Sequence, residues 1–373
     1  MRPVPRLPYI LLLSLSGLAG GVIAASGSPA VPAPGPASAS APAIAPALAL
    51  LPPAGAAGAA LPAASLRPAP SPVSRLPAYR AFPALYSPAV AAGASLSFDI
   101  PDEADMLRFR EESQARLPVL ANNQVLAFYG HPNSRRMGIL GEYPKEDLAR
   151  LLKGYAELYD EANGPAGVIP AFYLIYGTCW PEGEIGYLRT SIVEDYIEYA
   201  RKSGMLVFVD HQIGRFPVAD AVKRLLPFLK YPNVHLALDP EWRTTLPMKE
   251  IGTVSADEIN AAQAMVQDYL DREGIPGVKI LVVHQFKGRM IPDRARVRAD
   301  FGRVLLVHTA DGFGPPALKR HAYAFNSQAT NMPLKGFKLF FKSDTPGAGF
   351  DEPLLTPPEV LALEPRPSVI IYQ

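Results

Sequence analysis

Residues 205–239 read MLVFVDHQIGRFPVADAVKRLLPFLKYPNVHLALD. The segment starts with a short apolar run, passes through a stretch with helical spacing at 219–229, and ends in a second apolar run that again closes on aspartate. Short runs rich in Val, Leu and Phe are typical of strands buried on both faces, and a helix between two such strands joins them in parallel. The segment therefore predicts one β-α-β unit of an α/β fold.

The same alternation continues on both sides of this unit. Apolar runs typical of strands lie at 124–129, 168–176, 205–210, 234–239, 279–284, 303–308, 336–342 and 368–372. Helical spacing lies at 144–163, 192–202, 219–229, 256–272, 315–326 and 357–361. Eight parallel strands are the number that closes a (β/α)8 barrel, and no G-x-G-x-x-G turn follows the first strand to favour an open doubly wound sheet. The sequence predicts a TIM barrel.

The first part of the chain has a different composition. Arg2 and Arg6 precede an apolar run at 7–23 that ends in small residues, which is typical of a secretory signal peptide and is also long enough for a membrane anchor. An Ala/Pro-rich stretch with almost no charge follows, as in a disordered linker. We expect a signal peptide or anchor at 1–27, a linker at 28–95 and the barrel at 96–373. The protein is then exported, secreted or held at the cell envelope, and touches a membrane only if the first segment is not cleaved.

Charge and cysteine content exclude several classes of protein. The 36 basic and 35 acidic residues give a net charge of +1, which argues against a nucleic-acid partner. Cys179 is the single cysteine, so the chain can form neither an internal disulfide nor a cysteine-rich zinc site. Neither a P-loop nor a G-x-S-x-G elbow is present. We expect no cofactor, and a glycan or another small polar molecule as the partner.

Polar side chains collect at the predicted carboxyl ends of the strands, where barrels carry their active sites. The candidate catalytic residues are Glu241, Asp239, Asp210 and Asp344. The candidate substrate-binding residues are His131, Tyr176, Trp180, His211, Trp242, His284, Gln285, His308, Asp311, Lys342 and Tyr372.

The segment Asp239-Pro240-Glu241-Trp242 is the sharpest of these features. Two carboxyl groups stand two residues apart, so each can raise the pKa of the other, and the indole of Trp242 offers a flat surface for a sugar ring. Glycosidases need a second carboxyl group across the scissile bond, which Asp210, Asp311 or Asp344 could supply, or Asp239 itself. We expect Glu241 to be the general acid/base. The structural alternative is an ion pair of these acids with Arg243 or Arg215.

This strand-four acid followed by an aromatic residue resembles the (β/α)8 glycoside hydrolases, in which the acid/base often ends strand four. The spacing of Asp239 and Glu241 is also similar to the end of the chitinase-type motif, although His235 and Ala237 stand in the strand and the earlier aspartates are missing. The whole domain, including 353–373, is similar to secreted or lipoprotein-type actinobacterial barrel proteins without an assigned activity. That likeness implies the fold and export and no particular reaction.

Two other functions fit the same residues. His131, Asp210, His211, His284, His308 and Asp311 could bind a metal, and His284 and His308 match the fifth- and sixth-strand histidines of amidohydrolase barrels. Strand one lacks the H-x-H of that class, and strand eight ends in Tyr372 without an aspartate. The other alternative is a barrel that binds glycans without turnover.

Overall fold

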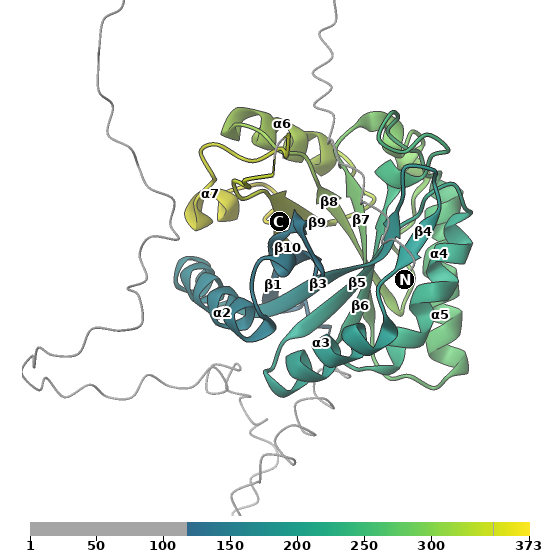
Figure 1. The fold of residues 1–373 in the computed structure, drawn as a ribbon, viewed down its shortest axis with the longest axis horizontal. Helices are drawn as coiled ribbons and strands as arrows, with labels where there is room; N and C mark the ends of the chain where they lie inside the picture. The colour runs from purple at the N-terminus through teal and green to yellow at the C-terminus, as the bar shows by residue number, and fades with distance from the viewer. Residues whose placement is uncertain (1–117, 346) are drawn as a thin grey trace, which may run out of the picture. The chain divides into compact units, whose positions relative to one another are not determined.

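Eight parallel strands close into a barrel in the computed structural model of the protein, which describes residues 118–345 and 347–373. Strand β1 pairs in parallel with both β3 and β10, and this double pairing closes the ring. Helices surround the strands on the outside (Figure 1). The predicted TIM barrel is confirmed. The expected signal segment, linker and first barrel residues, 1–117, lie outside the described residues.

The strands match the predicted apolar runs closely. The eight barrel strands are β1 Asn123–His131, β3 Gly167–Cys179, β5 Leu206–Gln212, β6 Val234–Asp239, β7 Lys279–Gln285, β8 Val304–Ala310, β9 Leu334–Leu339 and β10 Val369–Tyr372. Two antiparallel arms, β2 Ser134–Gly138 and β4 Ile185–Tyr187, pair with the carboxyl ends of β1 and β3. The seventh barrel strand lies two to three residues earlier than predicted, because Phe340 to Lys342 already belong to the following loop.

Six α-helices follow the predicted spacing: α2 Lys145–Ala162, α3 Thr190–Lys202, α4 Val218–Leu225, α5 Ala256–Arg272, α6 Pro316–Ser327 and α7 Pro357–Leu361. Capping boxes fix two of their starts, Ser255 with Glu258 before α5 and Thr356 with Glu359 before α7. The predicted helix at 219–229 is divided into α4 and the 3-10 turn η5 Leu226–Lys230, since Pro227 cannot donate the backbone hydrogen bond that an α-helix needs. Two 3-10 turns, η7 Gly288–Met290 and η8 Arg294–Arg296, connect β7 to β8 in place of an α-helix.

Alternate residues of each barrel strand face opposite sides, so the strands separate two apolar layers. The inner layer fills the barrel with side chains such as Ala127, Ala171, Phe208, Val282 and Val307. The outer layer packs the strands against the helices and is the larger of the two. The side on which a residue lies is therefore set by its odd or even position in the strand.

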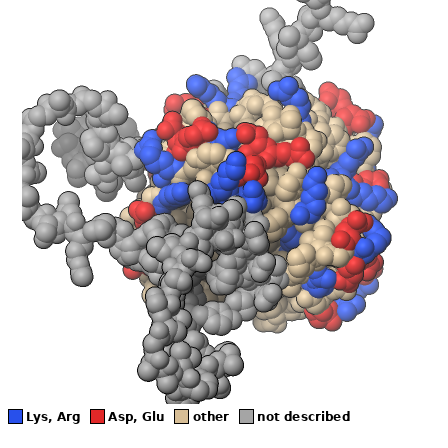
Figure 2. Space-filling view, turned by 90° about the horizontal axis from the view of Figure 1, so that it is seen from below, with Lys and Arg blue, Asp and Glu red and all other residues tan. Residues whose placement is uncertain are grey.

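The surface in Figure 2 carries lysines and arginines interspersed with aspartates and glutamates. On α3, Arg201 and Lys202 both pair with Glu198. Within the described part of the chain, no helix combines the length and the apolar character that a membrane span requires.

Candidate active site

Seven of the eight barrel strands each bring one polar side chain to the carboxyl end of the barrel interior. These are Tyr129 on β1, Tyr173 on β3, Asp210 on β5, Asp239 on β6, His284 on β7, Asp311 directly after β8 and Lys338 on β9. All seven are almost completely buried. The alternation of inward and outward positions along a strand explains this placement. Four of the seven lie two residues after an inward apolar residue of the same strand: Tyr129 after Ala127, Asp210 after Phe208, Asp239 after Ala237 and His284 after Val282.

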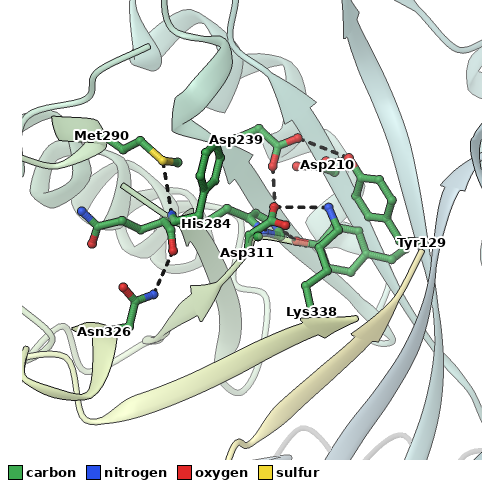
Figure 3. A network of polar contacts seen from close by, with 12 residues as sticks. Tyr129, Asp210, Asp239, His284, Met290, Asp311, Asn326 and Lys338 are labelled. Atoms are coloured by element: carbon green, nitrogen blue, oxygen red, sulfur yellow. Dashed lines mark hydrogen bonds and ion pairs between the residues drawn. The ribbon is translucent and has the colours of Figure 1, made fainter. Parts of the chain in front are cut away.

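The hydroxyl of Tyr129 joins two of the carboxylates. It lies 3.2 Å from Oδ2 of Asp210 and 3.3 Å from Oδ2 of Asp239, and Figure 3 shows the ring of Tyr129 pointing at both. A hydroxyl carries one hydrogen, so it can donate to only one of the two acids at a time. The oxygen of the other acid then needs a different partner, either a proton of its own or a cation.

His284 stands between the remaining members of the cluster. Its Nδ1 atom is 3.1 Å from Oδ2 of Asp311, and its Nε2 atom is 3.5 Å from Oδ1 of Asp239 and 2.7 Å from the hydroxyl of Tyr173. The ammonium group of Lys338 donates to Oδ2 of Asp311 at 3.3 Å and lies 3.8 Å from the ring centre of Tyr129 (Figure 3). Lys338 thus contacts both Asp311, which lies beside His284, and Tyr129, which lies beside Asp210 and Asp239.

Glu241 lies in η6 Pro240–Trp242, the short turn that leaves β6. Its backbone carbonyl accepts a hydrogen bond from Gly252, while Oε2 of its side chain is buried without a hydrogen-bond partner in the described structure. The expected structural alternative is not formed, because Arg243 is paired with Glu258 at 3.8 Å and Arg215 is paired with Glu184. Both arginines are therefore engaged away from Asp239 and Glu241.

The surroundings raise the pKa of some acids of this cluster and lower the pKa of another. Burial and the neighbouring charge of Asp239 raise the pKa of Asp210 and of Glu241 well above their usual values. Burial alone would also raise the pKa of Asp311, but Lys338 and His284 beside it lower that pKa below its usual range. Burial and the charges of Asp239 and Asp210 raise the pKa of Tyr129, so its hydroxyl remains protonated. A site that contains both a neutral acid and an ionised carboxylate can transfer protons in either direction.

Two overlapping sets of side chains in the described residues have the spacing of metal ligands. Asp210, Asp239 and His284 form one set, and Asp239, Glu241 and Asp311 form the other, with the potential ligand atoms of each set within 4.8 Å of one another. Either set could supply the ligands of a cation.

The structure brings five of the predicted site residues into this one cluster: Asp210, Asp239, Glu241, His284 and Asp311. They come from four consecutive strands or the turns that follow them. The predicted pairing of Glu241 with an acid from another strand is thus geometrically available, with Asp311 as the partner.

Five other predicted residues face the helices. Tyr176, His211, Gln285, His308 and Tyr372 occupy the positions between inward ones and point out of the barrel. His308 Nε2 lies 2.8 Å from Oε1 of Gln285, and the Tyr372 hydroxyl lies 2.8 Å from that of Tyr159 on α2. The ring of His211 packs on Gly177, where a side-chain carbon would lie 2.7 Å from it. The amidohydrolase-like metal set, which needs His308, is not assembled.

The remaining five predicted residues lie at or near the rim. His131 is partly exposed and its Nδ1 atom accepts a hydrogen bond from the backbone of Asn133. Trp180 covers Gly186 on the β4 arm, and Trp242 is half-buried beside Glu241. Asp344 is exposed and lies close enough to Glu142 to contribute, after burial, to the raised pKa of that residue. Lys342 has 70% of its side chain exposed and lies 3.9 Å from Glu352. The structure records no contact of Asp344 or Lys342 with the central acids.

Tyr129, Tyr173 and Lys338 belong to the network but were absent from the predicted set. Tyr129 and Tyr173 belong to inward-facing series, Val125–Ala127–Tyr129 and Ala171–Tyr173–Ile175, and the two-residue alternation of these series could have identified them. Lys338 lies inside the apolar run GFKLFF, where a lysine is conspicuous because its charge must be paired if the strand is buried.

No known protein family and no curated protein matches this sequence. Among solved structures, the chain is similar to an oxaloacetate acetylhydrolase in complex with oxalate (TM-score 0.44, 12% identity, 70% of this chain and 80% of the other). It is also similar to 2,3-dimethylmalate lyase, a member of the PEP mutase/isocitrate lyase superfamily (TM-score 0.40, 14% identity, 73% and 81%). A third match is a family 18 chitinase from Crocus vernus (TM-score 0.39, 11% identity, 67% and 92%). These three structures are an acetylhydrolase, a lyase and a glycoside hydrolase. The resemblance to actinobacterial secreted barrels stays a prediction.

Proposed function

We propose that this protein is an exported hydrolase that cleaves a glycosidic bond in an envelope or environmental glycan by carboxylate acid/base chemistry. The observation that carries the proposal is the spacing at the mouth of the barrel: Asp239, Glu241 and Asp311 each offer a carboxylate oxygen within 4.8 Å of the others. Glycosidases place two carboxyl groups across the scissile bond, about 5 Å apart in enzymes that retain the anomeric configuration and farther apart in those that invert it.

The contacts of each acid support separate roles. Glu241 has a buried Oε2 without a hydrogen-bond partner in the described residues, and Arg243 is paired with Glu258, which suits the group that protonates the leaving oxygen. Asp311 lies against the ammonium of Lys338 and the ring of His284, and so remains the ionised partner that attacks the anomeric carbon. Trp242 follows Glu241 directly and can stack on a sugar ring at the rim. With the shorter spacing, we expect retention of configuration.

The reaction can be tested by screening bacterial cell-wall and plant polysaccharides for the release of reducing ends. On any glycan that is cleaved, Glu241→Gln preserves the shape of the side chain and removes its proton, so the rate should fall by about 10²–10⁴-fold while binding persists. Glu182→Gln, the same change at an exposed glutamate, is the matched control and should keep the wild-type rate. Near wild-type turnover in Glu241→Gln would end the proposal.

The non-catalytic alternative gives a different result in the same screen. A barrel that only binds glycans should change the fluorescence of Trp180 or Trp242 with a polysaccharide and release no product. Export is supported by the sequence pattern alone, and mass spectrometry of the mature N-terminus tests it: cleavage near Ala25 is expected for a signal peptide.

A further inference from the structure

Asp210, Asp239 and His284, from the adjacent strands β5, β6 and β7, direct potential ligand atoms at one point. All three side chains are at most 1% exposed. We propose that these three residues bind a divalent transition-metal cation such as Mn²⁺ or Zn²⁺. This inference concerns binding and stands whether or not the protein cleaves a glycan.

Unsatisfied oxygens are the first argument for a cation. Oδ1 of Asp210 and Oδ1 of Asp239 are buried and lack a hydrogen-bond partner in the described residues. A buried carboxylate oxygen without a partner is costly, and a metal ion is one of the few groups that can satisfy two of them at once. The hydroxyl of Tyr129 cannot do so, because it faces the other oxygen of each acid and has one hydrogen.

The orientation of His284 is the second argument. The carboxylate of Asp311, 3.1 Å from Nδ1, favours the tautomer that carries its proton on Nδ1 and leaves the lone pair on Nε2. Nε2 then faces Oδ1 of Asp239 at 3.5 Å, so two electron-pair donors point at each other. Carboxylate–histidine–metal arrangements also place a carboxylate behind the ring. In the described residues Nδ1 of His284 makes no hydrogen bond, and Asp311 is held beside it at ion-pair distance. Without a cation, the hydroxyl of Tyr173 occupies Nε2 at 2.7 Å.

Charge balance is the third argument. Four carboxyl groups, those of Asp210, Asp239, Glu241 and Asp311, meet one ammonium group, that of Lys338, and this lysine is hydrogen-bonded to Asp311. When these acids are ionised, a divalent ion offsets the remaining negative charge, and without an ion the raised pKa values of Asp210 and Glu241 keep protons on them. Two carboxylates with one imidazole suit Mn²⁺ or Zn²⁺, whereas an all-oxygen set would suit Mg²⁺ or Ca²⁺. The second set, Asp239–Glu241–Asp311, is less suited because it lacks the imidazole and Asp311 is already paired.

Metal binding can be measured on the full chain after treatment with EDTA. Titration with Mn²⁺, followed by the loss of the free-ion signal in electron paramagnetic resonance, should reveal a single site per chain, and Zn²⁺ should displace the bound Mn²⁺. Asp210→Asn removes a ligand charge and His284→Ala removes the nitrogen, and each should abolish saturable binding. Asp311→Asn changes the group beside Nδ1, on the side of the ring away from the proposed ion, and should weaken binding by about 10–100-fold.

Two further variants separate a specific site from general effects. Tyr173→Phe removes the group that competes for Nε2, so its affinity for Mn²⁺ should equal or exceed that of the wild type. His308→Ala removes the histidine of the next strand, which faces the helices, and should bind as the wild type does. Circular dichroism checks that each variant is folded, and the wild-type and Tyr173→Phe titrations decide the question even if the ligand variants do not fold.

The inference is overturned if the wild-type chain and Tyr173→Phe bind no Mn²⁺ or Zn²⁺, or if folded Asp210→Asn binds as tightly as the wild type. Either result leaves the proposed hydrolysis intact when glycan cleavage depends on Glu241. Conversely, saturable binding that is lost in Asp210→Asn supports the metal site even if no glycan in the screen is cleaved.

Discussion

The ammonium nitrogen of Lys338 lies 3.3 Å from Oδ2 of Asp311, and less than a twentieth of the surface of the lysine is exposed. The two residues come from neighbouring strands, β9 and the end of β8, and pair at the level of the other acids. In a buried ion pair, the attraction between the two charges offsets the cost of removing them from water. Removal of one charge leaves the other buried without a partner. Lys338 is therefore the residue that allows so many carboxylates to share one site.

The first prediction is that Lys338→Met lowers the free energy of unfolding by about 3–5 kcal/mol, the usual cost of an uncompensated buried charge. The double variant Lys338→Met/Asp311→Asn should recover a large part of that loss, because the asparagine carries no charge to compensate. Urea unfolding of both proteins and of Asp311→Asn measures the coupling. Lys342→Met, at an exposed lysine in the loop after β9, should be nearly neutral. Equal stability of Lys338→Met and the wild type contradicts the assignment.

The second prediction compares two histidines that end adjacent strands. His284 faces the acids, and His308 faces Gln285 and the helices. On a glycan found in the screen, His284→Ala should reduce kcat/KM by about 10²-fold or more, because it removes a group in contact with both Asp239 and Asp311. His308→Ala should retain close to wild-type turnover and lose about 1–3 kcal/mol of stability, since it leaves a buried amide oxygen unpaired. A large loss of turnover in a folded His308→Ala protein would contradict the orientation described here.

The third prediction concerns Tyr372, which the sequence placed at the end of the last strand and therefore in the site. Its hydroxyl instead contacts that of Tyr159, and its ring stacks on Phe341 at a centroid distance of 5.1 Å. Tyr372→Phe should lower stability by about 1 kcal/mol, the net value of one hydrogen bond, and leave KM unchanged. Steady-state kinetics and thermal unfolding test both parts. An increase in KM with unchanged stability would return Tyr372 to the substrate site.

The architecture could be predicted from the sequence because strands buried on both faces form continuous apolar runs. The order of these runs is enough to define eight strands, as the unit 205–239 illustrates. Because these runs are apolar at consecutive positions, however, they do not indicate which side chains face into the barrel. Asp210 and His211 are neighbours in one strand, as are His284 and Gln285, and two neighbours cannot both point into the barrel. Strand ends were predicted well, and the alternation along each strand was the missing constraint.

Other parts of the site depend on contacts that no local pattern encodes. The Tyr129 hydroxyl meets Asp210 and Asp239, which lie 81 and 110 residues away in the sequence. Lys342 was favoured over Lys338 because it ended the apolar run, whereas the strand itself ends at Leu339. Such choices depend on register across the closed barrel, which only the three-dimensional structure supplies.

The last prediction concerns Lys279 at the start of β7, far from the acids along its strand. Its ammonium group donates hydrogen bonds to the backbone carbonyls of Tyr231 and Pro232, and burial lowers its pKa to about 7 from the usual value of 10.5. Between these two values, the unfolded chain holds a proton that the folded chain releases, so stability should rise with pH. The rise from one such group is at most about 1.4 kcal/mol per pH unit.

Urea unfolding between pH 7 and 8.5 tests this sign. Lys335, whose pKa burial lowers to about 8, acts in the same direction. Burial raises the pKa of Cys179, so this thiol ionises first in the unfolded chain and opposes the rise only at the upper end of the range. Lys279→Met should therefore reduce the slope of stability against pH without removing it. The matched control is Lys230→Met, at a lysine whose side chain is 58% exposed, and it should keep the wild-type slope. A wild-type stability that falls across this range, or a slope that Lys279→Met leaves unchanged, would show that Lys279 stays charged in the folded protein.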